Sequence, residues 1–588
     1  MTSFSVDTFD FTDGVVEELS GGDRRFMDWP VVYVLGAGNS RRSTATKSVY
    51  VGETLNAAKR MRQHLATEAK QGLSTLRLIV DPTFNKSVCL DLESYLIRML
   101  AGDGSYSVLN RNAGITEADY FDREKYRQTF SDVFEQLREE GVFTRTIPEI
   151  VNSDLFKLSP FKALTEDQAS AVEDIVEGLL KDFEAERPSS IVIQGAPGTG
   201  KTIVAIYLLK LLVDIARSRP DFDADPDTRF ADFFAEGNPE LLRGLRVALV
   251  IPQQSLRESV RNVFRKTPGL DPTMVMTAFD VGSASEDFDL VIIDEAHRLN
   301  QRANQPSGVQ NARFRDITVA LFGSDDHSKT QLDWIRAKSK HQILLLDSEQ
   351  SVRPADLPLA AVRGAIQQAE AADRHYRLRT QMRVSAGSDY VSYIRRILDP
   401  NGHAFGVNDG VIESFEGYDF RIFDELPRMH EAIRRRDEEV GLSRLVAGFA
   451  WEWKTKNDRS AFDIEIDGYQ LRWNGTQRDW IASATALEEV GSIHTVQGYD
   501  LNYAGVIIGG DLRYDKTRRR LFMDRSSYFD KKGMENNARL GITYTDDDLL
   551  RFVRNIYGVL LTRGMRGTYV YVVDDALREY LRAFIPSV

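Results

Sequence analysis

The most chemically specific stretch of the sequence is a glycine-rich loop at residues 195–202, which read GAPGTGKT. The loop follows an apolar run and opens an apolar helical segment at residues 203–212, the context that a phosphate-binding loop requires. Glycines let backbone N–H groups close around phosphates, and the helix N-terminus adds a favourable field. The expected nucleotide ligands are Gly195, Gly198, Thr199, Gly200, Lys201 on the β- and γ-phosphates, and Thr202 on Mg²⁺.

An acidic pair follows a later apolar run at residues 290–293. A carboxylate at the end of a buried strand is placed to hold a metal ion, so we expect Asp294 to bind Mg²⁺ together with Thr202. Glu295 is placed to polarise the attacking water, which is a general-base task. Taken alone, the pair is equally well explained by helix N-capping. The phosphate-binding loop upstream favours the metal-binding interpretation.

A second set of reactive side chains lies nearer the N-terminus. Arg60 and His64 are four residues apart in an expected helix at residues 55–68, so they share one face of that helix. Tyr33 and Tyr50 lie on β-rich runs that precede the helix. Each residue alone has an ordinary explanation, because a tyrosine on a strand is usually structural and the helix face would be a solvated one. Only their order and spacing together suggest a site.

The elements that position these residues differ between the two ends of the chain. Residues 31–125 read as strand, loop, strand, helix, strand, helix, with β-rich runs at 31–35 and 48–51. Beyond residue 161, continuous apolar runs alternate with helical segments, which is typical of parallel α/β sheets. We expect buried strands at residues 191–194, 247–251, 290–293, 343–346, 445–449, 506–508 and 569–573. The stretch 220–242, rich in Asp and Phe, is expected to be a surface insertion.

These patterns predict an α/β multidomain protein. The expected domains are a lead-in at 1–24, a small α+β domain at 25–125, a linker at 126–160, one parallel α/β lobe at 161–365 and a second lobe at 366–588 with a basic insertion at 511–550. A chain of 588 residues is too long for one hydrophobic core, in agreement with several domains.

Charge and composition bound the classes of partner. The net charge of −13 argues only weakly against nucleic acid, because a motor grips a strand through local charge. Residues 40–77 and 511–532 are locally basic, although a solvated face explains each equally well. Cys89 is the only cysteine, which excludes an internal disulfide framework and a thiolate zinc cluster. With no signal sequence and no run of eighteen apolar residues, we expect a cytoplasmic protein without a membrane partner.

Combined in chain order, the motifs at residues 161–575 resemble those of superfamily 1 helicases. The narrower likeness to the Schlafen-type helicase domain is carried by residues 510–514 and 562–567. The further matching segments are 164–168 for the Q motif with Gln168, 252–256 for motif Ia, 346–350 for motif III with Gln350, Gln381 with Arg383 for motif IV, 494–500 for motif V with Gln497 and Gly498, and 561–563 for motif VI with Arg563.

The resemblance implies two RecA-like lobes with ATP between them, so that opening and closing converts hydrolysis to stepping. In this family Gln168 would read adenine, Gln350 would sense the γ-phosphate, and Gln497 with Gly498 would complete the nucleotide site. Arg383 and Arg563 would stabilise charge on the transferred phosphoryl group. Arg566 is a second candidate, for which a salt bridge is an equally good explanation.

Two motifs depart from the helicase pattern, and one pair of tryptophans has two alternative explanations. Motif III carries Ser348 and Glu349 before its glutamine, and motif V ends in Asp500 where Glu is commoner. These changes spare ATP chemistry and leave unwinding, as distinct from translocation, undecided. Trp451 and Trp453 follow an expected strand, where aromatic side chains stack on bases in some proteins and belong to the core more often.

Residues 30–115 resemble the GIY-YIG nuclease family, with Val31-Val32-Tyr33 as a degenerate first signature and Tyr50-Val51-Gly52 as a better second one. Glu93 and Asn110 fall where the family's metal-binding glutamate and late asparagine lie. The resemblance implies that Tyr33 or Tyr50 helps to activate water, that Arg60 holds the phosphate with His64 on the same helix, and that Glu93 carries one divalent metal, Mg²⁺ or Mn²⁺.

The leading hypothesis is therefore an ATP-driven motor joined to a metal-dependent endonuclease. We expect DNA as the partner and leave RNA open; a role in defence against foreign DNA or in DNA repair is analogy from the domain pairing. The second hypothesis is a remodeller whose N-terminal domain only binds nucleic acid. The third is a regulatory NTPase that switches partners without moving along a strand.

Overall fold

The structure is a computed structural model. It describes residues 4–37, 47–67, 70, 72–110, 120–162, 164–218, 229–302, 307–347, 353–399, 412–476, 480–496 and 499–588. Two compact units divide the chain. The first comprises residues 1–184, 206–245 and 259–274, and the second comprises residues 185–205, 246–258 and 275–588. Each unit has its own sheets and is described by itself.

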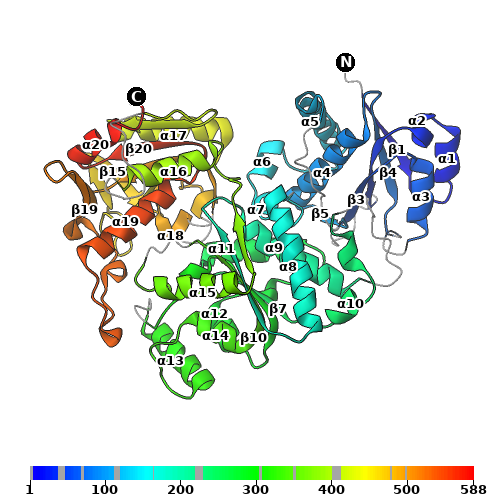
Figure 1. Ribbon diagram of the computed structural model, residues 1–588. Helices are drawn as coiled ribbons and strands as arrows, with labels where there is room; N and C mark the ends of the chain where they lie inside the picture. The colour runs from blue at the N-terminus through cyan, green and yellow to red at the C-terminus, as the bar shows by residue number, and fades with distance from the viewer. Residues whose placement is uncertain are drawn as a thin grey trace. The chain divides into compact units, whose positions relative to one another are not determined.

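A five-stranded mixed sheet forms the centre of the first unit (Figure 1). Its strand order is β1-β4-β2-β3-β5, and every pair is antiparallel except β3 with β5. Alternating side chains of β2 enter different cores, because successive residues of a strand face opposite sides. The strands are β1 Ser5–Asp10, β2 Val31–Gly36, β3 Lys47–Thr54, β4 Thr75–Val80 and β5 Tyr106–Val108.

Helices cover both faces of this sheet. On one face Tyr33 and Leu35 pack with α1 Val15–Gly21, α2 Arg25–Asp28 and α3 Ala57–Leu65. On the other face Val32 and Val34 pack with α4 Lys86–Asp103 and the helices that follow it. Asn56 and Asn85 begin α3 and α4, since each side chain accepts a hydrogen bond from the backbone N–H three residues on.

Two segments expected to lie outside the domains belong to this fold. Residues 126–160, expected as a linker, form α5 Arg123–Glu139, α6 Ile147–Val151 and α7 Asp154–Lys157. The many charges of α5 lie on its outer side, while Phe130, Val133, Phe134 and Leu137 fill the core on α4. The lead-in also contributes structure, because β1 pairs along its whole length with β4.

The remaining elements of the first unit include α8 Glu166–Glu184, η2 Ala231–Phe234 and α10 Asn238–Leu241. Arg229 ties this part together, with its guanidinium 2.8 Å from carboxylate oxygens of both Glu166 and Glu173. Phe230 is buried against Tyr207, so the expected surface insertion is anchored at its C-terminal part. Residues 220–228 of that insertion lie outside the described residues.

The first sheet of the second unit has six strands in the order β11-β6-β10-β9-β7-β8, all parallel. Helices α9 Lys201–Ala216 and α11 Gln254–Lys266 begin after β6 and β7. The strands are β6 Ser189–Gly195, β7 Val247–Val250, β8 Val275–Met276, β9 Phe288–Ile293, β10 Ser339–Leu346 and β11 His375–Leu378; the other helices are α12 Ala278–Gly282, α13 Gly308–Phe322, α14 Gln331–Lys338 and α15 Leu359–Ala371.

The second sheet of this unit has seven strands in the order β12-β20-β17-β13-β16-β15-β14, parallel except for β14 at the edge. A separate hairpin of β18 Leu512–Asp515 and β19 Arg520–Met523 follows β17. The sheet consists of β12 Asp419–Phe423, β13 Ser443–Ala447, β14 Ile464–Ile466, β15 Tyr469–Trp473, β16 Glu489–Ser492, β17 Leu501–Ile508 and β20 Gly564–Val572; its helices are α16 Gly387–Ile397, α17 Leu426–Val440, α18 Ile493–Val496, α19 Asp546–Leu561 and α20 Asp575–Arg582.

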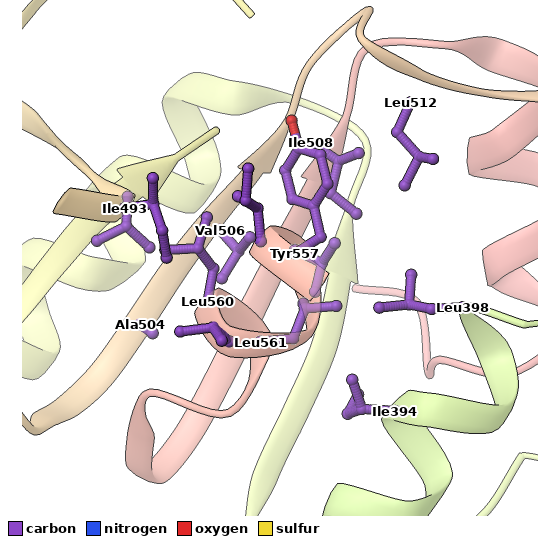
Figure 2. Close-up of a cluster of buried hydrophobic side chains, with 14 of the residues drawn as sticks. Ile394, Leu398, Ile493, Ala504, Val506, Ile508, Leu512, Tyr557, Leu560 and Leu561 are labelled. Atoms are coloured by element: carbon purple, nitrogen blue, oxygen red, sulfur yellow. The ribbon is translucent and has the colours of Figure 1, made fainter. Parts of the chain in front are cut away.

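The core beneath this second sheet holds α19 in place. Figure 2 shows Tyr557, Leu560 and Leu561 of α19 among side chains of β17, including Val506 and Ile508. Thr545 begins the helix with a capping box to Asp548, and three aspartates in its first turn suit the helix dipole. The last turn of α19 therefore carries residues 562 and 563 to a defined place at the start of β20.

The expectation of two parallel α/β sheets is confirmed, and the seven expected strands all lie within or overlap observed ones. One boundary differs: β11 pairs with β6, so the first sheet takes up residues to Leu378 rather than ending near residue 365. In the described part of the chain, no helix is both long and apolar enough to cross a membrane.

Phe134→Ala should lower the free energy of unfolding of the first unit by about 3–5 kcal/mol, because it leaves a cavity beneath α4. Phe121→Ala is the matched control: Phe121 is 88% exposed whereas Phe134 is 0% exposed, so the control should change stability little. Urea unfolding followed by fluorescence and circular dichroism measures both. Equal behaviour of the two variants would contradict the packing of α5 as described.

Candidate functional site

The glycine-rich loop closes the end of β6 and is held by its own side chains. The ammonium of Lys201 donates to the carbonyl oxygens of Gly195 at 2.8 Å and of Ala196 at 3.1 Å. The hydroxyl of Thr199 donates to the carbonyl of Ala196 at 2.9 Å. Gly198 and Gly200 adopt φ of +84° and +75°, the left-handed region that glycine enters without steric cost. Lys201 is thus buried at the loop, where its charge faces backbone oxygens.

Thr202 and Asp294 meet beside the loop. The Thr202 hydroxyl donates to Asp294 Oδ2 at 2.7 Å, although Thr202 lies at the start of α9 and Asp294 follows β9. Burial raises the pKa of Asp294 to about 6, and the neighbouring Glu295 carboxylate adds to the rise. A hydroxyl and a carboxylate oxygen form the hard donor set that Mg²⁺ prefers, so these two residues fit that ion.

Glu295 is held by a strained backbone and two basic neighbours. It has φ of +49°, a conformation that non-glycine residues rarely adopt, and strain of this kind clusters at functional sites. Its Oε2 lies 3.1 Å from His297 Nε2 and 3.7 Å from Arg298 Nε. Nδ1 of His297 accepts from the backbone N–H of Asp347 at 3.2 Å. His297 therefore links the acidic pair to the end of β10, where motif III was expected.

The segment 381–383 lies directly on the glycine-rich loop. The Gln381 amide donates to the carbonyl of Pro197 at 2.7 Å, and the backbone N–H of Met382 donates to the carbonyl of Gly198 at 2.9 Å. A Cβ at residue 198 would lie 2.0 Å from the Gln381 amide oxygen. Gly198 is therefore required twice, by its backbone conformation and by this close approach.

Two arginines converge near this segment. Arg383 Nε donates to the carboxylate of Asp500, and Arg563 Nη1 donates to the carbonyl of Tyr499 at 3.1 Å. Burial and the neighbouring Arg383 charge lower the pKa of Arg563 to about 9, against the opposing charges of Asp500 and Glu295. The structure thus brings together Arg383, Arg563 and Glu295, which the sequence places far apart.

This arrangement leaves buried positive charge without a full set of acceptors. Arg563 is 4% exposed, and in the described part of the chain its Nε makes no hydrogen bond. The same holds for Nε and Nη2 of Arg298, which is 8% exposed. Leaving such donors unpaired is costly, so the cluster is suited to receive an anion. Arg298 was missed at the sequence level, since only its position directly after His297 signals it.

The positions of the other expected nucleotide ligands say less about a nucleotide site. Gln168 lies in the first unit, at the start of α8, where its amide oxygen accepts from the backbone N–H of Thr165 at 3.0 Å. Gln350, Gln497 and Gly498 lie outside the described residues. Arg566 is exposed, and its positive charge opposes the rise in the pKa of the Tyr503 hydroxyl that burial causes.

The aromatic and basic candidates of the second sheet have ordinary roles. Trp451 packs against the buried core, with its ring centroid 6.3 Å from that of Trp473, and Trp453 joins the same cluster. In the hairpin of β18 and β19, Arg513 pairs with Asp574 at 3.0 Å and with Asp524 at 3.3 Å. These contacts favour the structural explanation for both features.

A second polar cluster lies in the first unit, on the face of the sheet covered by α3. Tyr33 Oη is 2.7 Å from His64 Nε2, and Arg60 Nε donates to the same Tyr33 oxygen at 3.4 Å. The Tyr50 ring packs edge-on to His64, with centroids 5.3 Å apart. Tyr33 and His64 are buried, whereas Arg60 and Tyr50 are partly exposed. The helix face and the two tyrosines thus meet as the sequence suggested.

Two residues of the second signature shape this cluster. Gly52 lies opposite Tyr33 in the sheet, and a Cβ on Gly52 would lie 2.2 Å from the Tyr33 oxygen, so only glycine leaves room for the ring. The Asn110 side chain makes a pair of hydrogen bonds to the backbone of Val51, accepting at 3.0 Å and donating at 2.8 Å. Together they fix β3 where it carries Tyr50.

Electrostatics relate Glu93 to this cluster. Burial raises the pKa of Tyr33 well above its ordinary value, the neighbouring Tyr50 and the Glu93 charge add to the rise, and Arg60 opposes it. Burial lowers the pKa of His64 to about 2, and the charges of Lys70 and Arg60 add to the fall. His64 is therefore neutral.

Lys70 was missed at the sequence level. Its ammonium lies 2.6 Å from His64 Nδ1 and 3.6 Å from the centroid of the Tyr50 ring. The residue follows the end of α3, where helical periodicity no longer reports which side chains turn inward. Its membership of a locally basic window is the one signal that the sequence offers.

The chain is similar to a curated protein and, more distantly, to solved helicase structures. The chain is 27% identical over 422 residues to the uncharacterized protein YPL245W of Saccharomyces cerevisiae, covering 67% of this chain and 84% of that one. A structure of two coordinating Pif1 helicases at forked double-stranded DNA covers 71% of this chain and 94% of its own, with 10% identity and a TM-score of 0.24. The DEAD-box helicase Mss116 bound to single-stranded RNA and UDP-BeF covers 75% of each chain, with 13% identity and a TM-score of 0.31. Structural likenesses this distant carry no argument about this chain.

The family comparison is more informative. The model of the Schlafen group 3 DNA/RNA helicase domain matches residues 188–574. That range contains the glycine-rich loop, the acidic pair, the segment 381–383 and both arginines, and it spans more than half of the chain. The chain therefore belongs to the Schlafen group 3 DNA/RNA helicase domain family.

Proposed function

We propose that the second unit is an ATP-driven motor that moves along nucleic acid. The observation that carries this proposal is the convergence of Lys201, Thr202, Asp294, Glu295 and Arg563 around one glycine-rich loop. The family of the chain supports the same proposal, because its model is that of a DNA/RNA helicase domain. DNA is the proposed partner, and RNA is an alternative that the same family description supports.

Each residue has a chemical task in this proposal. The loop amides and Lys201 bind the phosphates of ATP, with Lys201 exchanging its backbone oxygens for phosphate oxygens. Thr202 and Asp294 would hold Mg²⁺, which neutralises phosphate charge when bound. Glu295 orients the attacking water and accepts its proton. Arg563, with Arg383, places positive charge where negative charge develops on the γ-phosphoryl group.

Lys201→Ala should abolish ATP hydrolysis, because the phosphates lose their main cationic ligand. Lys340→Ala is the control, since Lys340 is an exposed lysine of the same unit that pairs with Asp289 at 3.4 Å. Phosphate release is measured with and without single-stranded DNA or RNA. Persistent turnover in Lys201→Ala would refute the assignment of the loop, and wild-type turnover that ignores every nucleic acid would favour a regulatory NTPase.

We further propose that the first unit carries a metal-dependent phosphodiester endonuclease of the GIY-YIG type. Support comes from Tyr33, Tyr50, Arg60 and His64, which converge within hydrogen-bonding or ring-contact distance, and from the effect of Glu93 on Tyr33. Arg60 is partly exposed and positively charged, so it can hold the scissile phosphate. Tyr33 or Tyr50 would help to activate the water.

Glu93 would hold one divalent ion, Mg²⁺ or Mn²⁺, which supplies charge for the leaving oxygen when bound. Among the described residues, no group of three or more acidic, histidine or cysteine side chains could hold a metal. A single carboxylate is nevertheless sufficient for Mg²⁺, since that ion keeps several waters and takes oxygens from substrate phosphate. We also propose that cleavage is coupled to movement along nucleic acid, in defence against foreign DNA or in DNA repair.

Arg60→Ala should lower cleavage of plasmid or single-stranded substrate on the order of a hundredfold, because a charge on the phosphate is lost. ATP hydrolysis should survive. Arg62→Ala is the matched control: Arg62 lies on the same helix and is exposed. Glu93→Gln should likewise abolish metal-dependent cutting. If both Arg60→Ala and Glu93→Gln cut as the wild type does, the first unit only binds nucleic acid, which is the alternative function.

A further inference from the structure

The neutral imidazole of His64 lies between the Lys70 ammonium, which can only donate a hydrogen bond, and the Tyr33 hydroxyl, which can donate or accept one. On one side Lys70 Nζ is 2.6 Å from Nδ1 and 3.4 Å from Nε2; on the other side Tyr33 Oη is 2.7 Å from Nε2. An ammonium group can only donate a hydrogen bond, and a neutral imidazole has one donor and one acceptor nitrogen. The shorter contact therefore makes Nδ1 the acceptor and leaves the ring hydrogen on Nε2.

This tautomer reverses the obvious direction of the hydrogen bond between His64 and Tyr33. With its hydrogen on Nε2, His64 donates to the Tyr33 oxygen rather than accepting from it. Arg60 Nε donates to the same oxygen at 3.4 Å. Both donors favour a Tyr33 oxygen that carries negative charge. The Tyr33 hydroxyl hydrogen is left for a third partner, such as the water or phosphate of the proposed substrate.

Lys70 is itself held in place by the neighbouring ring. Its ammonium lies 3.6 Å from the centroid of Tyr50, a cation–π contact that restricts the side chain. Tyr50 also packs edge-on against His64, so Lys70, Tyr50 and His64 contact one another next to Tyr33. Lys70 contacts His64 and Tyr50, the two rings next to Tyr33, which makes it a positioning residue.

We propose that Lys70 selects the Nε2–H tautomer of His64, and that His64 thereby prepares the Tyr33 oxygen for the proposed nuclease reaction. The inference rests on the proposed nuclease function of the first unit, but its first test does not. The selection is a property of the protein without substrate, metal or ATP.

Nitrogen NMR of the full chain labelled with ¹⁵N-histidine tests the tautomer directly, because the shifts of protonated and bare ring nitrogens differ. The chain has 8 histidines, and His64→Gln assigns the resonance. We expect wild-type His64 to carry its proton on Nε2, and Lys70→Met to lose that preference. Lys59→Met is the control, since Lys59 is an exposed lysine on α3. A proton on Nδ1 in the wild type, or an unchanged His64 signal in Lys70→Met, overturns the proposal.

Cleavage assays give a second readout. Lys70→Met should lower the cleavage rate roughly tenfold or more at unchanged substrate KM, and Lys70→Arg should restore most of the rate. A wild-type midpoint of urea unfolding for the first unit shows that the variants are folded. Cleavage by Lys70→Met at the wild-type rate overturns the proposal. A wild-type protein that has the expected tautomer and does not cut refutes the proposed nuclease function instead.

Discussion

Among the residues that the structure describes, buried positive charge with too few hydrogen-bond acceptors is the feature on which the proposed chemistry of the second unit depends. Arg563 is held almost out of water by the end of α19 and donates to one backbone carbonyl, while Arg383 beside it is paired with Asp500. Two guanidinium groups in one place repel each other, and an anion removes that cost. The glycine-rich loop, Lys201 and the Thr202–Asp294 pair lie in the same unit, and their chemistry is that of phosphate and Mg²⁺.

In the first unit, the five-stranded sheet positions the side chains of the candidate site. Its sheet separates an apolar core beneath α4 from a second apolar core beneath α3 that includes the Tyr33 ring, and alternate residues of β2 enter the two cores. Gly52 leaves room for the Tyr33 ring, and Asn110 holds the neighbouring strand through its backbone. Tyr33 and Tyr50 are therefore positioned by contacts within the protein, as the proposed site requires.

Much of this architecture follows from local sequence, and the remainder depends on contacts between distant residues. Apolar runs predict β6, β9, β10 and β17 because parallel strands are buried on both faces. The many charges of segment 126–160 predict a linker, because α5 buries only four apolar residues among them. Strand β11 is too short and too polar for its sequence to predict a buried strand. The contact of Lys70 with His64 joins a turn to a helix, and the contact of Arg563 with Tyr499 joins a helix end to a loop. Hydrophobic periodicity in the sequence does not predict such contacts.

The most direct test of the central claim is Arg563→Met, measured for thermal stability without nucleotide and for ATP hydrolysis. If Arg563 is kept as a partner for a phosphate, its removal should leave the unliganded transition temperature unchanged or higher, since a buried and incompletely paired charge is lost. Hydrolysis should fall on the order of a thousandfold. A strongly lowered transition temperature with hydrolysis intact would show that Arg563 is a structural residue, and it would contradict the account.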